Sequence, residues 1–238
     1  MKYFCLLIIF IFSFLIGETI LIPEDYPSIQ QGINVAVDGD TVLVANGDYY
    51  ENIVVDKSIV LASYAIYDDL NQWVAFDEFG FNQWVIDNAY IQNTRIIGSN
   101  SIDQNYSSVI LITPSFETCI TPEIVGFTIM DGEGTTVFRT SPVNENELIP
   151  IKIGGGILAD VSSPYIHHNA FINNGSTELY SGGAMQITSD AEDWSFNNRF
   201  ENFNPRCDVQ DFEIPNNFYN GNDAIYGNSM TNKFHQND

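Results

Sequence analysis

Short apolar runs separated by polar turns dominate this chain from residue 41 onward. Three such runs follow one another at 41–45, 52–55 and 58–63, and each is rich in Val and Ile. Runs of this length, bounded by Gly, Asn and Asp, are typical of β-strands. Further strands are expected at 84–86, 94–97, 109–112, 124–129, 156–158 and 184–187. The pattern therefore predicts an all-β chain.

Residues 28–37 depart from this pattern, because they have the spacing of a short helix. Ser28 is followed three residues later by Gln31, which is the arrangement of a capping box. The apolar face of the helix would comprise Ile29, Ile33, Ala36 and Val37. A polar turn at 38–40 ends the segment. No other helix is expected after the N-terminal region.

A glycine and asparagine pattern recurs in the second half of the chain. The glycine blocks at Gly154 and Gly182 start 28 residues apart, and the Asn-X-Phe units at Asn169 and Asn198 lie 29 apart. A repeat of this length is typical of chains that coil and stack on themselves. Asparagines at equivalent turns of such coils can form hydrogen-bonded ladders. The expected ladder residues are Asn169, Asn173, Asn198 and Asn202.

Residues 28–63 resemble the start of secreted right-handed parallel β-helix proteins, the pectin-lyase-like repeat families. The resemblance rests on the helix at 29–36, the Gly-Asp-Thr-Val-Leu-Val unit at 39–44, the Gly-Asp-Tyr-Tyr-Glu-Asn-Ile unit at 47–53 and the lysine-led strand at 57–61. Residues 126–132 and 154–174 fit the repeat deeper in such chains. The resemblance implies a right-handed parallel β-helix, a solenoid, over residues 19–238. The helix would cap its raw apolar first coil.

Two stretches interrupt the strand pattern, at 65–82 and 133–150, and are expected to leave the coil as loops. The first mixes acidic and aromatic residues, namely Asp68, Asp69, Trp73, Phe76, Asp77, Glu78, Phe79 and Phe81. Long loops on a regular scaffold often carry a binding surface, and they can equally be plain insertions. The end of the chain, 216–238, is polar and lacks a capping helix. This predicts a β-helix that is incomplete at its C-terminus.

Residues 1–17 have the features of a secretory signal peptide. Lys2 precedes an almost unbroken apolar run at 5–16, which Gly17 ends. The run is shorter than the roughly 20 residues of a membrane span. We therefore expect a secreted or cell-surface protein with no membrane span in the mature chain. Export permits a disulfide between Cys119 and Cys207, and the alternative is two small buried side chains.

Charge narrows the range of partners. The chain has 31 acidic and 8 basic residues, for a formal net charge of -23. Nucleic acid is therefore not expected as a partner, because its phosphates require a basic surface. An anionic membrane surface is disfavoured for the same reason. The charge suits either simple solubility or the collection of divalent cations such as calcium.

Few residues suggest chemistry. Asp131 and Glu133 follow a predicted strand and could hold calcium or take part in catalysis. His167 and His168 could be an acid–base pair or metal ligands, and a structural role in the repeat is the alternative. Neighbouring residues on a strand face opposite ways, so the two are not expected to bind one metal. A further cluster, which could contact sugar or form a solvated turn, comprises Asp190, Glu192, Asp193 and Trp194.

The resemblance implies possible enzyme chemistry, since polysaccharide lyases and hydrolases occur on this scaffold. The arginine motif of the lyases and the Gly-His-Gly and Arg-Ile-Lys motifs of the hydrolases are absent from this chain. We therefore expect a non-catalytic binding or adhesion module, with a polysaccharide or cell-surface glycan as its partner. One alternative is a polysaccharide lyase or glycoside hydrolase acting on acidic polysaccharide with paired carboxylates. The other is a structural spacer in a larger surface protein.

Overall fold

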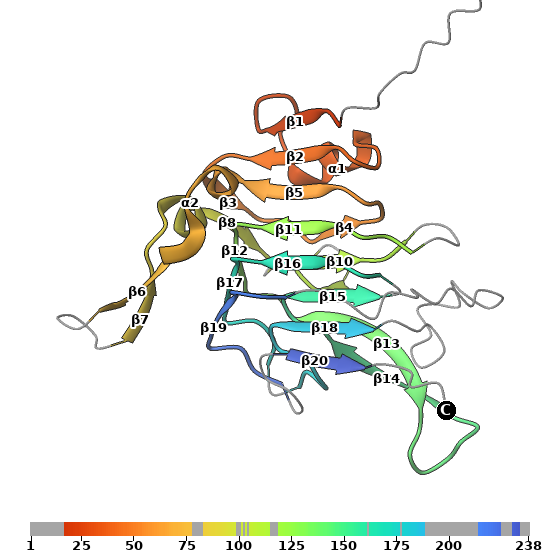
Figure 1. Ribbon diagram of the computed structural model, residues 1–238. Helices are drawn as coiled ribbons and strands as arrows, with labels where there is room; N and C mark the ends of the chain where they lie inside the picture. The colour runs from red at the N-terminus through yellow and green to blue at the C-terminus, as the bar shows by residue number, and fades with distance from the viewer. Residues whose placement is uncertain are drawn as a thin grey trace, which may run out of the picture.

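The computed structural model describes residues 17–77, 83–98, 101, 103, 105–114, 119–160, 162–176, 178–188, 214–224 and 230–233. This part of the chain is mostly β-strand (Figure 1). Three sheets have five strands each, and every strand pair within them is parallel. The prediction of a mostly β chain with parallel strands is confirmed.

The chain visits the three sheets in turn. The first sheet has the order β1-β2-β5-β11-β16, with bounds Thr19–Ile22, Thr41–Val44, Val60–Ser63, Glu123–Val125 and Tyr165–His167. The second has the order β3-β8-β12-β17-β19, with bounds Gly47–Tyr49, Thr94–Ile97, Thr128–Met130, Ala170–Ile172 and Phe218–Asn220. The third has the order β4-β10-β15-β18-β20, with bounds Ile53–Val55, Ile110–Ile112, Ile157–Asp160, Met185–Thr188 and Met230–Lys233. We call one passage through the three sheets, such as β2-β3-β4, a circuit.

Each circuit places its inward-facing side chains in register with those of the circuit before it. One column in the first sheet consists of Val42, Leu61, Ile124 and Ile166. A column in the third sheet consists of Ile53, Ile110, Ile157 and Met185. These side chains are at most 1% exposed. Burial of each is worth about 1.5–3 kcal/mol, so the columns are the main source of stability.

The repeated glycine blocks lie on neighbouring circuits, as their spacing predicts. The backbone N–H groups of Gly155 and Gly156 donate to the carbonyls of Gly182 and Gly183, at 3.0 and 3.1 Å. A Cβ atom added to Gly155 would lie 2.3 Å from the Gly183 carbonyl oxygen. Glycine is required here because any side chain would force the two circuits apart.

Helix α1 (Ile29–Val35) packs against β1, β2 and β4 at the N-terminal end of the sheets (Figure 1). Its cap is the predicted one, since the Ser28 side chain accepts a hydrogen bond from the Gln31 N–H at 3.3 Å. Ile29 and Ile33 are fully buried in the core. The predicted burial of Val37 is wrong, because the helix ends two residues earlier and Val37 is 53% exposed.

Three residues from the resembling segment hold α1 to the first circuit. The Glu51 carboxylate accepts hydrogen bonds from the first two backbone N–H groups of the helix, at 2.9 and 3.0 Å. The Gln30 side chain exchanges two hydrogen bonds with the backbone of Val54, at 2.7 and 3.2 Å. The Lys57 ammonium donates to two carbonyls at the end of the helix, at 3.0 and 3.1 Å. Opposite charges thus lie at the two helix ends, in the orientation that the helix dipole favours.

Left-handed backbone marks the corners on both sides of the second sheet. Strands β12, β17 and β19 are each preceded, two residues earlier, by a residue with positive φ. These residues are Gly126, His168 and Asn216, with φ of 87, 52 and 56. The residues just after these strands are Asp131, Asn173 and Gly221, with φ of 59, 53 and 66. Positive φ is uncommon outside glycine and is enriched in Asn, Asp and His. The same two corners therefore recur in three successive circuits.

Buried asparagines follow these corners and bond between circuits. The backbone N–H groups of Asn169 and Asn174 donate to the side chains of Asn217 and Asn222, both at 3.0 Å. The ladder prediction is confirmed for Asn169 and wrong for Asn173, because Asn173 takes the exposed left-handed corner and the next residue turns inward. The other two expected members, Asn198 and Asn202, lie outside the described residues.

The first of two inserts lies between β5 and β8, and we call residues 64–93 the aromatic insert. It consists of the 3₁₀ helices η1 (Tyr64–Tyr67) and η2 (Leu70–Gln72), the antiparallel hairpin of β6 (Val74–Asp77) and β7 (Gln83–Ile86), and helix α2 (Ala89–Asn93). The expected loop at 65–82 therefore has regular structure in its described part, which ends at Asp77. The sequence pattern missed α2 because its five residues are too few for a period, and its stability comes from the Asn88 cap.

The second insert is an antiparallel hairpin of β13 (Gly134–Thr140) and β14 (Leu148–Ile153), with β9 (Tyr106–Ser107) beside β13. The prediction of a loop at 133–150 is therefore wrong, because this segment contains β13 and the start of β14. Threonine and charged residues break the apolar run, so the strand signal was weak. Val137 and Ile153 of the hairpin pack on Leu111 and Leu158, which face outward from the third sheet.

Two expectations from the sequence concern the cysteines and the membrane. Cys119 is disulfide-bonded. Its pairing with Cys207 stays a prediction, since Cys207 lies outside the described residues. Within the described ranges, no helix combines the length and apolar character that crossing a membrane requires.

Candidate functional site

The adjacent histidines His167 and His168 meet at a corner between the first and second sheets. His167 ends β16, and His168 follows with a positive φ of 52. Their Nδ1 atoms lie 2.7 Å apart. The expectation that the two side chains face opposite ways is wrong, because His168 lies in a left-handed corner and not in the strand. The geometry requires one proton between the two Nδ1 atoms.

Glu123 fixes the orientation of the pair from the neighbouring strand. Its Oε1 atom lies 3.0 Å from Nε2 of His167, so His167 donates to the carboxylate through Nε2. The register of β11 and β16 places Glu123 opposite Tyr165. The Tyr165 ring stacks on the His167 ring, with centroids 4.1 Å apart. Glu123, His167 and His168 therefore form a continuous hydrogen-bonded chain.

The aromatic insert reaches this chain through Trp73. The Trp73 ring meets His168 edge-on, with centroids 5.9 Å apart, and is only 5% exposed. Burial lowers the pKa of His168 from its ordinary value of 6.5, and the nearby His167 lowers that pKa further. The chain therefore ends in His168, a proton acceptor that is protonated less readily than a free histidine. The sequence pattern did not connect Glu123 or Trp73 with the histidines, because both are brought to them only by the fold.

The structure separates the roles of Asp131 and Glu133. Asp131 occupies a left-handed corner with φ of 59, equivalent to Asn173 and Gly221 in the next circuits. The side chain of Glu133 is 62% exposed and lies 3.6 Å from the Lys152 ammonium. Throughout the described residues, no three His, Cys, Asp or Glu side chains are grouped so that they could hold a metal ion. Asp131 thus has a backbone role, and calcium binding at this pair stays a prediction.

The remaining candidates from the sequence lie outside the described residues. They are Asp190, Glu192, Asp193 and Trp194.

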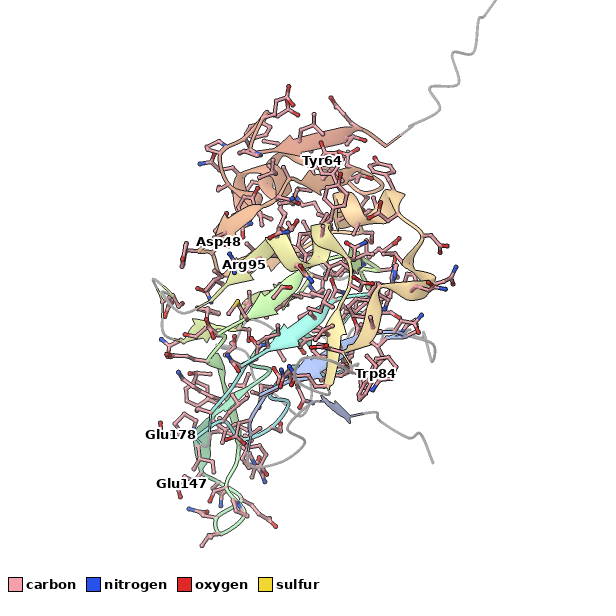
Figure 2. All side chains as sticks on the ribbon, turned by 90° about the vertical axis from the view of Figure 1, so that its left-hand side faces the viewer. Asp48, Tyr64, Trp84, Arg95, Glu147 and Glu178 are labelled. Carbon is pink, nitrogen blue, oxygen red and sulfur yellow. The ribbon has the colours of Figure 1, made fainter. Side chains whose placement is uncertain are left out.

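The aromatic insert groups Phe76, which the sequence pattern placed in a possible binding loop, with rings that the pattern did not single out. Tyr67, Tyr64 and Tyr90 form a row, with successive ring centroids 6.2 and 6.0 Å apart. On the hairpin, Phe76 and Trp84 are opposite each other and meet edge-on at 5.5 Å. Figure 2 shows Tyr64 close to the sheets and Trp84 on the projecting hairpin. The density of aromatic residues between 64 and 90 was the available signal.

Exposure distinguishes the insert from the rest of the described surface. Six aromatic side chains are classed as exposed in the described ranges, and four belong to the insert. These four are Tyr67 at 70%, Trp84 at 58%, Phe76 at 42% and Tyr90 at 37%. The other two are Tyr50 and Tyr165. Exposed rings gathered on one projecting element mark an interaction surface.

A third feature lies on the hairpin of β13 and β14. A cavity of about 320 Å³ is lined by Thr136, Pro150, Ile151, Lys152, Glu178 and Tyr180. Arg139 donates to the Tyr180 hydroxyl, and its guanidinium lies 4.9 Å from the centre of that ring. Glu178 and the hairpin residue Glu147 lie on the side of the molecule away from Trp84 (Figure 2). Its polar lining includes the Lys152 ammonium, which pairs with Glu133, the Glu178 carboxylate and the Tyr180 hydroxyl.

Comparison with known proteins yields no relative. No family model, no curated protein and no solved structure matches this chain.

Proposed function

We propose that this chain is a secreted, right-handed parallel β-helix that binds glycans through its aromatic insert. The regular passage of the chain through three parallel sheets supports the β-helix. The asparagine ladders and the recurring left-handed corners support it further, because both repeat from circuit to circuit. The helix α1 then acts as the cap of the N-terminal end.

The observation that carries the binding proposal is the exposure of rings on the aromatic insert. Sugar rings present flat apolar faces, and exposed aromatic rings can stack on them while nearby polar groups bond the hydroxyls. The Tyr64, Tyr67 and Tyr90 row offers one group of rings for such contacts, and the Phe76 and Trp84 pair offers a second. Asn71, Gln83 and Gln92 are exposed on the same insert and can bond sugar hydroxyls.

Glycan-array binding by the secreted chain tests the proposal. Tyr67→Ala and Trp84→Ala each remove an exposed ring from the insert, and we expect each to weaken binding. Tyr50→Ala is the matched control, because Tyr50 is 61% exposed and lies outside the insert. Loss of binding in Tyr50→Ala equal to that in the insert variants would contradict the proposal, as would unchanged binding in the Tyr67 and Trp84 double variant.

The histidine chain favours a second candidate, a polysaccharide-cleaving enzyme. A carboxylate that orients a histidine is a common way to prepare a general base. In this case His168, the outer member, would take the proton from the sugar. Product release from acidic polysaccharide, assayed with wild type and His168→Asn, tests this candidate. Cleavage that is absent from the wild type, or unchanged in the variant, would exclude it.

A further inference from the structure

We infer that the aromatic insert takes a cationic saccharide of the amino-sugar class. The inference rests on the proposed function and narrows it to one ligand chemistry. The first observation is charge, since residues 58–94 contain no Lys, Arg or His. The same segment contains five acidic residues, which are Asp68, Asp69, Asp77, Glu78 and Asp87.

The second observation is the position of these exposed acids next to the exposed rings along the chain. Asp68 and Asp69 directly follow Tyr67 in the chain, and both are exposed. Asp87 is also exposed and comes three residues before Tyr90. A protonated amine above a ring face gains a cation–π interaction. The same amine gains a charge-assisted hydrogen bond from a carboxylate within reach.

Electrostatics disfavours the other saccharide classes. Uronic acids and sulfated sugars would meet like charge on the insert and on a chain of net charge -23. A neutral sugar could stack on the tyrosine row and donate hydroxyl hydrogen bonds to the carboxylates, but it would leave their charge unpaired. A sugar with free amines also pairs that charge and gains the cation–π interaction with the rings.

Existing contacts of the acids allow a conservative test. Asp68 accepts a hydrogen bond from the Asn88 side chain at 2.8 Å. Asp69 accepts from the backbone and side chain of Asn71, at 3.1 and 2.6 Å. Asparagine keeps an acceptor oxygen at both positions, so the variant Asp68→Asn with Asp69→Asn should fold normally. The control variant, Glu145→Gln with Glu147→Gln, changes the charge equally on the β13–β14 hairpin.

The experiment measures binding of the full chain to deacetylated glucosamine oligomers, to the N-acetylated oligomers of the same length, and to galacturonate oligomers. We expect the deacetylated oligomer to bind best, and to weaken at about 1 M salt, where the Debye length is about 3 Å. The Asp68 and Asp69 variant should bind it about fivefold less tightly, as loss of an exposed ion pair with the ligand implies. The control variant should match wild type.

Several outcomes would overturn the inference. Equal binding of acetylated and deacetylated oligomers, with no effect of the Asp68 and Asp69 variant, leaves glycan binding intact and rejects the amino-sugar class. Tighter binding of galacturonate oligomers than of deacetylated glucosamine oligomers likewise rejects the amino-sugar class. Oligolysine binding as tightly as the deacetylated oligomer shows attraction for any cation and rejects the saccharide class. Absence of binding to every saccharide on the array rejects the proposed function itself.

Discussion

The side-chain oxygen of Asn217 accepts hydrogen bonds from both the backbone N–H and the side-chain amide of Asn169, at 3.0 and 3.3 Å. Asn169 bonds to the preceding circuit in the same way, because its own side-chain oxygen accepts a hydrogen bond from the Phe127 N–H at 3.0 Å. Its amide also donates to the carbonyls of Ile124 and His167, at 2.9 and 2.8 Å. One buried side chain therefore satisfies backbone groups that belong to two circuits.

Replacing Asn169 by Ala should destabilise the protein by about 2–4 kcal/mol, because the Phe127 N–H and the carbonyls of Ile124 and His167 each lose a buried hydrogen bond. Chemical denaturation measures the free energy of unfolding. Asn173→Gly is the control, since Asn173 is exposed and its positive φ suits glycine. We expect the control to be neutral or slightly more stable. Equal losses in the two variants would contradict the ladder role.

Replacing Glu51 by Ala should loosen helix α1. The carboxylate caps the first two backbone N–H groups of the helix, and loss of such a cap costs about 1–2 kcal/mol. Hydrogen exchange should rise first at residues 29–35. Glu147→Ala, at an exposed position on the β13–β14 hairpin, should leave exchange in the helix unchanged. Unaltered exchange in Glu51→Ala would show that packing alone holds the helix.

Acidification should destabilise the protein through His168. Its pKa is lowered from 6.5 in the folded state, chiefly by burial, so the unfolded chain binds this proton more tightly. The contribution of this group is therefore fully present above pH 6.5 and is lost as the pH falls from 6.5 toward the folded pKa.

His168→Asn isolates this effect, because asparagine adopts positive φ at the equivalent corner, Asn216. Thermal unfolding of wild type and variant is compared across the acidic range. Carboxylates titrate in both proteins, so their effects cancel. The difference in Tm between wild type and variant therefore measures the contribution of His168 to stability. We expect the Tm of the wild type to fall more steeply below pH 6.5. Parallel curves would mean that the histidine pair does not control stability.

Asp25 protects the open edge of the first sheet. Strand β1 ends the sheet, and the Leu21 N–H on its free side donates to the Asp25 carboxylate at 2.8 Å. Unpaired backbone groups on an edge strand recruit other chains, and a charge there prevents it. Asp25→Ala should therefore increase self-association, measured by size-exclusion chromatography with light scattering. Asp25→Asn keeps the acceptor but not the charge, and we expect an intermediate result. A monomeric Asp25→Ala protein would contradict this role.

Local patterns predicted much of this architecture because they depend on short-range physics. The Val and Ile runs became the buried columns, and the glycine blocks became neighbours through a 28-residue register between Ile157 and Met185. The Ser28 cap lies where its sequence pattern places it. In each case, the information lies within a few residues or in a repeated spacing.

The histidine chain could not be read in the same way, because it depends on contacts between distant parts of the chain. Glu123 lies 44 residues from His167, and the pair meets only through the β11–β16 register. The partner of Asn169 was misjudged for the same reason, since it lies 48 residues away rather than 29. The left-handed backbone at His168 also cannot be recognised from a histidine alone.

Both inserts depart at corners and return to the same parallel register. The insert at 64–93 joins the first sheet to the second, and the β13–β14 hairpin joins the second to the third. Their lengths can therefore vary without altering the pairing of the strands on either side. Either insert can be replaced during evolution while the other is retained, and foreign recognition loops can be grafted at either junction.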